Sequence, residues 1–478
     1  MSSSLSEPIR RALRTDLTSS LVVFLVALPL CVGVAVASGV PAELGLVTGI
    51  VGGLVTGLLP GSSLQVSGPA AGLTVLVHET VGTYGLAALG AIVLATGLIQ
   101  LGLGALKLGR WFRAISVAVV EGMLAGIGLV IIADQLYAMA DADAPARGLD
   151  KITGLPGLAA DLAGGTASLS AFAVGAGTIA VIVLWSRMPA RIRVVPGALA
   201  AVVLATAVTS LGGLSAETVR VEGLLSAIQP PGMDSLGDLA GIGVIGTVVA
   251  FTLIASAESL FSAAAVDRLH DGPRTDYDKE LMAQGAGNTV CGALGALPLT
   301  AVIVRSSANV QAGAKTKASR VLHGVWLLLF AALFPAVLGI LPLAALAGVL
   351  VHAGFKLLPL RRLVPLWREH RGEAVVLTVT ALAIVSVNMF EGVLIGLALA
   401  VIKTAWDTSH IHTEVHDDGE GPVRVAISGN ATFLRLPKML DALEALPADR
   451  AVELDLSDLR HADHACRTAL NAWTERHN

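Results

Sequence analysis

The stretch SLQVSGPAAGLTVLV, residues 63–77, interrupts a succession of long apolar runs. It alternates like a strand, breaks at Gly68-Pro69 and only then turns apolar and helical in pattern. Non-helical backbone leaves N–H and C=O groups unpaired, and at membrane depth only protein or a water-filled cavity can satisfy them. If the neighbouring runs span a bilayer, the sequence predicts that this stretch lines a cavity.

The chain is too apolar for a soluble domain. Hydrophobic residues make up 54% of its 478 residues, charged residues make up 14%, and the mean hydropathy is +0.75. A run of about 19 apolar residues crosses about 30 Å of hydrocarbon. Charge-free runs of that length occur at 17–42, 44–77, 80–106, 162–186, 239–257 and 281–304. The sequence therefore predicts an all-α polytopic membrane protein.

Lysine and arginine positions orient the predicted spans. If the N-terminus is cytoplasmic and the spans alternate, all but four of the Lys and Arg residues before Lys403 fall on the cytoplasmic side, as the positive-inside rule requires. The exceptions are Arg147, Lys151 and Arg220 outside and Arg305 at membrane depth, while the outer loops carry Glu217, Glu222 and Asp234. We expect a cell (inner) membrane protein with both termini cytoplasmic. The predicted fourteen elements begin near residues 18, 42, 69, 84, 115, 167, 195, 241, 281, 305, 321, 341, 374 and 391.

The second half of the chain contains a counterpart of the opening stretch. In NTVCGALGALPLTAVIVRSSANVQAGA, from Asn288, a Gly-rich helix again leads to a short extended piece and a helix start. Interrupted segments at corresponding places in two halves indicate an inverted-repeat transporter whose half-helices meet near the bilayer midplane. We expect extended pieces at 63–68 and 300–304, with Pro69 in a first helical turn, where its missing N–H is harmless.

The predicted chemistry is anion binding. A helix that begins inside the membrane directs free N–H groups and about half a positive charge at whatever faces its first turn. Arg305 would open the second half-helix and add its own charge. An intramembrane charge is a functional candidate by default, although Arg305 could instead pair with an acidic residue for structure alone.

Glu258 is the second charge predicted to lie deep, in the eighth element. Ser262, four residues on, shares its helix face. A carboxylate beside an anion site could take up a proton or a sodium ion and couple cation entry to anion entry. The alternative is a structural partner for Arg305 or for the opposing half-helix.

The chain changes character near His410. Beyond it, VRVAISG, LPKMLDALEALP, AVELDLS and HACRTALNAWTE have the patterns of strand, helix, strand and helix. We therefore divide the chain into a cytoplasmic segment, 1–15, a transport domain, 16–406, and a small α/β domain, 407–478. Cys31, Cys291 and Cys466 lie too far apart to suggest a disulfide framework or a metal site, and we expect no cofactor and no nucleic-acid partner.

Four segments carry a family resemblance. They are ALPLCVGVAVASGV, LQVSGPAAGLTVLV, AESLFSAAAVDRL and, above all, DYDKELMAQGAGNTVCGALGALPLTAVIVRSSANVQAGAKT. These segments resemble the SulP family of sulfate permease-like anion transporters. The resemblance implies a seven-plus-seven inverted repeat shared with uracil carriers, a core domain moving against a gate domain, and usually a homodimer. It also implies that the tail is a STAS-like domain. This tail departs from the usual STAS pattern, because it is short and has no glycine after LDLS.

The resemblance places an anion pocket on specific residues. They are Leu30, Val34, Gly68, Pro69, Ala70, Ala71, Val304, Arg305 and Ser306, and Glu258 falls on the family's acidic coupling position. Many members have Gln where this chain has Leu30, and an apolar residue there is closer to the bicarbonate-transporting branch. Sodium-coupled members offer hydroxyls near the carboxylate; Ser262 could serve, but Ile303 offers none, so coupling through H+ or Na+ stays open.

The expected function is secondary active transport of a small inorganic anion, bicarbonate or sulfate, by alternating access. An uncoupled anion channel or exchanger and a nucleobase or dicarboxylate carrier on the same fold are the alternatives. A membrane enzyme is not expected, because the predicted spans contain no nucleophile motif and no His/Cys/Asp metal constellation. A tail that acts only in signalling is a further alternative.

Overall fold

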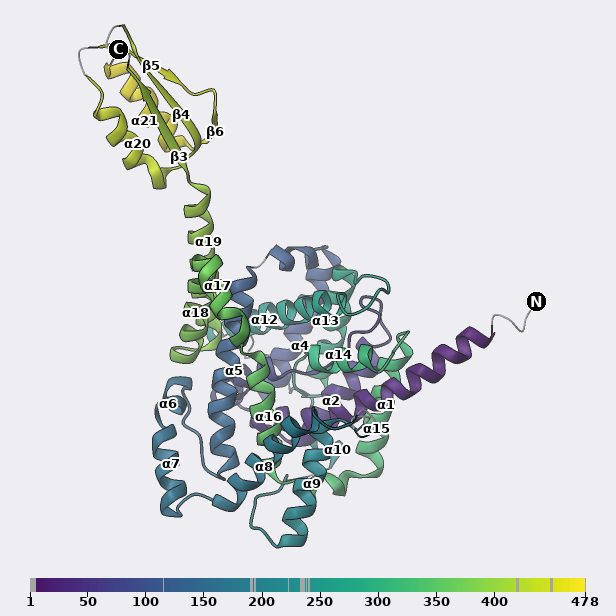
Figure 1. The fold of residues 1–478 in the computed structure, drawn as a ribbon. Coiled ribbons are helices and arrows are strands. Elements are labelled where there is room, and N and C mark those ends of the chain that lie inside the picture. Colours follow the sequence, from purple (N-terminus) through teal and green to yellow (C-terminus); the bar gives the residue numbers. More distant parts are fainter. Residues whose placement is uncertain are drawn as a thin grey trace.

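The computed structural model describes residues 6–114, 116–189, 192, 195–221, 223–232, 237, 239, 241–417, 421–447 and 450–477. Arg191, Arg193, Glu222 and Asp234, which contribute to the predicted charge pattern, lie outside these residues. A large helical body and a small tail containing a sheet are joined by one helix, α19 (Met389–Thr408) (Figure 1).

The first half of the helical body contains the predicted interruption. Its elements are α1 (Ser6–Ala37), α2 (Ala42–Val51), η1 (Gly52–Thr56), β1 (Ser67–Pro69), η2 (Ala71–Leu73), α3 (Thr74–Tyr84), α4 (Leu86–Ala105), η3 (Gly109–Ala114), α5 (Val117–Met139), α6 (Gly148–Thr153), α7 (Leu155–Gly164), α8 (Leu169–Trp185), α9 (Gly197–Gly212) and α10 (Leu224–Ala227). The short helices α6, α7 and α10 were not predicted.

The second half repeats the order of helix, short strand and helix. Its elements are α12 (Ile242–Val266), α13 (Tyr277–Ala293), β2 (Leu299–Ala301), α14 (Ile303–Gln311), α15 (Ala318–Leu333), η5 (Pro335–Ile340), α16 (Leu343–Leu357), α17 (Leu360–Glu369), α18 (Arg371–Ser386) and α19. Helix α17, amphipathic and without a buried residue, was not predicted as a separate element.

A helix or strand begins within about five residues of every predicted element start except the first, near residue 18, because α1 already begins at Ser6. By length and apolar composition, six helices of the described chain could cross a membrane, or up to seven if the bent pair α7 and α8 counts as one span. One of the six joins α16 and α17. The number of fourteen crossings stays a prediction.

Close packing of helices depends on glycine. Helices α4 and α13 pack along each other, and a Cβ atom on Gly285 would lie 2.7 Å from the backbone N of Leu101. Likewise, a Cβ atom on Gly126 would lie 2.9 Å from Cβ of Ile384, where α5 meets α18. Side chains at these positions would separate the helices, so the glycines have the packing role expected in membrane bundles.

The tail has its own apolar core. Strand β4 (Val423–Ala431) pairs antiparallel with β3 (Ile411–His416) and parallel with both β5 (Val452–Asp455) and β6 (Leu459–Ala462). Two helices, α20 (Leu436–Glu444) and α21 (His464–His477), contribute Met439, Leu443, Cys466 and Trp473 to this core. The predicted order of strand, helix, strand and helix is present, but the prediction lacked β3 and β6.

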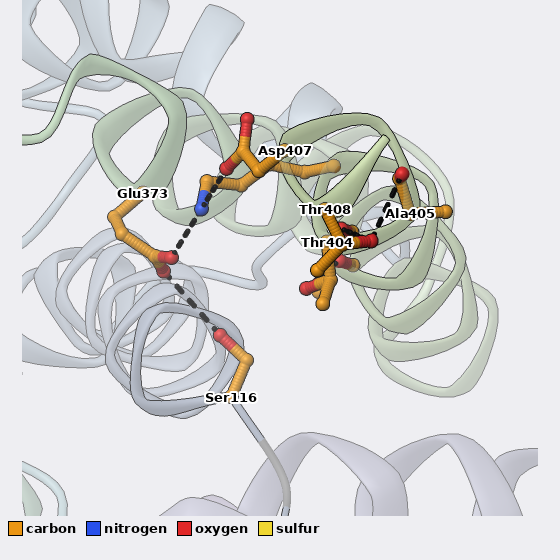
Figure 2. Close-up of polar contacts among 8 residues, drawn as sticks. Ser116, Glu373, Thr404, Ala405, Asp407 and Thr408 are labelled. Carbon is orange, nitrogen blue, oxygen red and sulfur yellow. Dashed lines mark hydrogen bonds and ion pairs between the residues drawn. The ribbon is translucent and has the colours of Figure 1, made fainter. Parts of the chain in front are cut away.

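Polar contacts link α19 to the first turns of two helices of the body. Nζ of Lys403 lies 2.8 Å from Glu373 on α18 and 2.9 Å from Asp407, and Glu373 also accepts a 3.5 Å hydrogen bond from Ser116, which precedes α5 (Figure 2). At the far end of α19, the guanidinium of Arg435 lies over the Trp406 ring and donates to the Ser409 carbonyl at 2.8 Å. The tail is therefore attached by side-chain contacts as well as by the chain.

Candidate functional site

The two interrupted segments meet as a pair of short strands. β1 and β2 are antiparallel, with Ser67 opposite Ala301, Gly68 opposite Thr300 and Pro69 opposite Leu299. All six residues are buried. The non-helical backbone of each half of the chain is thus satisfied in part by the other half, as buried backbone at membrane depth requires.

The structure corrects two details of the prediction. Pro69 is the last residue of β1 and does not lie in a first helical turn, because η2 begins at Ala71 and α3 at Thr74. The second extended piece ends at Ala301, so Val304 is already helical. Antiparallel pairing explains both shifts. Pro69 stays extended because Leu299 lies opposite it, and β2 ends at Ala301 because that residue lies opposite Ser67, the first residue of β1.

Amide side chains on α13 support the strand pair. Asn288 donates to the carbonyl of Leu299 at 3.1 Å and accepts from its N–H at 2.8 Å. One turn earlier, Gln284 donates to the hydroxyl of Ser67 at 2.8 Å. Another turn earlier, Glu280 accepts from the N–H of Ser62 at 2.7 Å. One face of α13 therefore holds both interrupted segments.

Three further side chains complete this support. The hydroxyl of Ser259 accepts from the N–H of Ala301 at 3.2 Å, and Asn309 donates to the carbonyl of Leu64 at 2.9 Å. Ser306 accepts from the N–H of Val66 at 2.9 Å and donates to the carbonyl of Val302 at 2.8 Å. The predicted pocket residue Ser306 therefore has its hydroxyl engaged by backbone groups of both segments.

The starts of the two half-helices carry no side-chain cap. η2 follows Ala70, and α14 follows Val302; neither residue caps with a side chain. The first turn of α14 is accessible, with Ile303 41% and Val304 38% exposed, although β2 beside it is buried. Uncapped N–H groups next to an accessible space form a site suited to an anion.

Arg305 lies in the third position of α14 and is 1% exposed. Its Nη2 donates to the carbonyl of Pro69 at 3.3 Å, and its Nη1 lies against the Cα of Gly68. Within the described ranges, Nε and Nη1 have no hydrogen-bond partner and Arg305 makes no ion pair. The predicted structural pairing with an acidic residue, Glu258 included, is therefore not present in this structure.

Glu258 faces the first half-helix from α12. A Cβ atom on Gly72 would lie 2.6 Å from its Oε1 and 2.8 Å from its Oε2. Oε2 is buried and has no hydrogen-bond partner among the residues the structure describes. Ser262 follows one turn later and is 2% exposed. The carboxylate is therefore next to the uncapped start of η2 and has an unused oxygen.

The remaining predicted pocket residues lie around this centre. Leu30 and Val34 belong to α1, which packs against both β1 and α14. Val34 and Ala70 are buried, whereas Leu30 and Ala71 are half-buried. The structure thus brings together the three segments that carry the predicted pocket.

A cavity lies further along α3 and is not lined by any predicted pocket residue. Its polar lining consists of Thr74, His78, Glu79, Asp134 and Lys151, the last two forming a 2.5 Å ion pair. We place the candidate site at the half-helix starts and not in this cavity, because the unpartnered groups of Arg305 and Glu258 lie at those starts. In the described ranges, no group of three or more His, Cys, Asp or Glu residues could hold a metal ion.

The prediction missed the supporting residues Gln284, Asn288 and Ser259. A signal was present, because Glu280, Gln284 and Asn288 recur every fourth residue in the motif ELMAQGAGN and so share one helix face. A polar stripe on a membrane helix points to buried partners. The sequence does not say which backbone groups are the partners, because that depends on the fold.

Comparison with known proteins identifies the family. The model of the sulfate permease family matches residues 13–380. The chain belongs to the sulfate permease family. The family consists of anion transporters, and membership agrees with the resemblance seen in the sequence. The match ends before α19 and the tail, so a STAS domain in the tail stays a prediction.

This sulfate permease family member is similar to a bicarbonate transporter in sequence and to two transporters of known structure. The bicarbonate transporter BicA of Synechocystis sp. is 25% identical over 451 residues, covering 86% of this chain and 76% of BicA. The solved transmembrane domain of a cyanobacterial BicA superposes with a TM-score of 0.68 at 23% identity, covering 82% of this chain and 98% of that one. The structure of SLC26A9 superposes with a TM-score of 0.78 at 17% identity, covering 98% of this chain and 83% of that one. These superpositions show a shared transporter fold.

Proposed function

We propose that this protein is a secondary active transporter of a small inorganic anion, bicarbonate or sulfate, that works by alternating access and is coupled to H+ or Na+. The observation that carries the proposal is the position of Glu258, whose carboxylate touches the backbone at Gly72 and has an unpartnered oxygen. A negative group at the start of an anion-binding helix is useful to transport only if its charge is neutralised when the anion binds.

The anion would bind between the two half-helix starts. Backbone N–H groups at Ala70 and Ala71 and at Val304 would donate hydrogen bonds, and Arg305 would contribute charge from behind Pro69. Leu30 and Val34 would close the pocket from α1. In this arrangement, the positive potential comes mainly from backbone dipoles, so a compact anion would bind reversibly.

Glu258 would be the coupling residue. Protonation, or a sodium ion held by Glu258 and the hydroxyl of Ser262, would remove the repulsion between the carboxylate and the incoming anion. Cation entry would thereby promote anion entry. The unpartnered Oε2 of Glu258 is available to accept either cation.

A small inorganic anion fits better than a nucleobase or a dicarboxylate. A larger ligand needs side-chain hydrogen-bond partners to fix its orientation. Leu30, Val34, Ala70 and Ala71 offer none, and the hydroxyl of Ser306 is engaged by Val66 and Val302. The family name favours sulfate and the BicA relatives favour bicarbonate, so both anions belong in the test.

The surrounding organisation is part of the proposal. We infer a transport domain over 16–406 in which a core carrying the strand pair moves against a gate, arranged as a seven-plus-seven inverted repeat. The segment 407–478 would be a STAS-like cytoplasmic domain, and the protein would act as a homodimer in the inner membrane with both termini cytoplasmic.

The test is uptake of labelled bicarbonate and labelled sulfate into proteoliposomes under imposed proton or sodium gradients. One anion should accumulate against its gradient, and Glu258→Gln should abolish the dependence on the coupling ion. Flux that follows only the membrane potential and ignores both gradients would instead identify a channel. Exchange that requires an anion on both sides would identify an uncoupled exchanger.

A further inference from the structure

Helix α17 presents large apolar side chains to its surroundings. Leu360 is 63% exposed, Val364 is 59% exposed and Trp367 is 51% exposed. These residues follow the spacing i, i+4 and i+7 and therefore form one stripe along the helix. A neighbouring flank, with Leu363 and Leu366, packs against a cluster formed by α5, α18 and α19. The exposed stripe is thus the side of α17 that this chain does not cover.

The basic residues around α17 fall into two groups. Arg362 forms a 2.8 Å ion pair with Glu121 on α5, and Lys403 lies 2.8 Å from Glu373 on α18. These contacts hold helices together. Arg361, Arg368 and Arg371 are exposed and, in the described part of the chain, form no ion pair. They are free to meet an external anion.

Helical geometry places Arg361 and Arg368 together. Seven residues are almost two full turns, so both side chains leave the same side of α17, about 10 Å apart along the axis. That side borders the exposed apolar stripe. Leu358 and Pro359 separate α17 from the largely buried α16, and no residue of α17 is buried. A helix with this charge cannot lie in hydrocarbon, but one apolar stripe beside one basic edge suits the boundary between acyl chains and headgroups.

We propose that α17 is an interfacial helix that binds anionic phospholipids. Leu360, Val364 and Trp367 enter the acyl-chain boundary, while Arg361, Arg368 and Arg371 bind headgroup phosphates. Charge complementarity selects lipid as the occupant. If a second copy of the same surface covered the stripe, the unpaired guanidiniums of Arg361 and Arg368 beside it, together with Arg371 at the start of α18, would repel their counterparts.

The test uses the full chain in detergent, titrated separately with phosphatidylglycerol and phosphatidylcholine and observed by native mass spectrometry. Each arginine near an anionic surface contributes about 1 kcal/mol, or roughly fivefold in affinity. The variant Arg361→Gln/Arg368→Gln/Arg371→Gln should therefore lose about one hundredfold of its preference for phosphatidylglycerol at low salt. The control, Arg460→Gln/Arg467→Gln/Arg476→Gln, makes the same charge change on the tail and should keep the wild-type preference.

A second measurement does not depend on the arginine variant. In vesicles containing brominated phosphatidylglycerol, the lipid quenches the fluorescence of any tryptophan that it contacts. Quenching that is present in the wild type and absent in Trp367→Phe therefore reports contact between Trp367 and lipid. Quenching of Trp367 in the wild type is the expected result, and absence of quenching would overturn the proposal. Equal phosphatidylglycerol preference in both triple variants would also overturn it. The proposal would also be overturned if Leu360→Gln dissociated a dimer in pure phosphatidylcholine, because the stripe would then be an interface between two copies of the chain.

Discussion

A Cβ atom built on Gly72 would lie 2.6 Å from Oε1 of Glu258, so the carboxylate rests directly on the backbone at the start of the first half-helix. The two residues come from different halves of the chain, α12 and η2. Their contact brings a titratable group to an uncapped helix start and connects the proposed cation site to the proposed anion site.

Gly72→Ala should impair transport. The added methyl group would push the carboxylate of Glu258 away from the half-helix, and we expect coupled uptake to fall at least tenfold, about 1.4 kcal/mol in the barrier. Labelled-anion uptake into proteoliposomes measures the change. Gly82→Ala, on α3, is the matched control, because a Cβ atom there meets nothing within 4 Å. Wild-type uptake by the Gly72 variant would remove the contact from the mechanism.

Arg305→Gln should weaken anion binding without unfolding the protein. In the described part of the chain its guanidinium makes one hydrogen bond, to the carbonyl of Pro69, and no ion pair, and we expect KM for the anion to rise about tenfold. Arg320→Gln is the contrasting variant. Arg320 donates to the carbonyls of Leu59 at 2.9 Å and Gln65 at 3.4 Å, so its loss should lower thermal stability first. If instead Arg305→Gln mainly lowers the melting temperature, Arg305 has a structural role.

Asn288→Ala should loosen the strand pair. The substitution leaves both the N–H and the carbonyl of Leu299 buried without that partner, and each such group costs about 1–3 kcal/mol. We expect a lower thermal unfolding temperature in detergent together with lost uptake. Thr247→Ala is the control, since its hydroxyl donates to the carbonyl of Gly243 within its own helix. An unchanged melting temperature would mean that Asn288 does not support β2.

Asp463→Ala should destabilise α21. The carboxylate accepts from the N–H of Cys466 at 2.9 Å and from the N–H of Phe433 at 2.6 Å, and the bond from Cys466 is the main cause of its lowered pKa. Loss of such a cap costs about 1 kcal/mol. Hydrogen exchange of α21 in the full chain measures the effect, with Asp458→Ala as a charge-matched control.

The pH dependence of this cap has a definite sign. Because the pKa of Asp463 is lower in the folded state, its stabilisation is fully present above the unfolded pKa of about 3.9 and is lost as pH falls through the folded value. The difference between wild type and Asp463→Ala should therefore be constant near neutral pH and shrink below about pH 4. A difference that persists in acid would assign the effect to packing.

Much of the fold was readable from local sequence. Apolar runs located the helices, the break at Gly68-Pro69 located the first interruption, and VRSSAN located the second half-helix. The strand boundaries were less accurate, because pairing between β1 and β2 keeps Pro69 extended and no local pattern reports a partner 230 residues away. β3 and β6 were missed for the same reason, since each is defined by pairing with β4.

For the candidate site, too, the sequence identified one part and only the tertiary structure decided the other. Sequence alone identified Arg305 and Glu258, because a charge within an apolar run is costly enough to need a reason. Only the tertiary structure decided that these two do not pair, that Glu258 rests on Gly72 and that Ser306 is engaged by Val66. Hydropathy and helix breaks are properties of neighbours along the chain, whereas the partners of buried polar groups come from distant segments. The sequence by itself determined a membrane protein with two interrupted helices; folding decided which groups remain unpartnered where those helices meet.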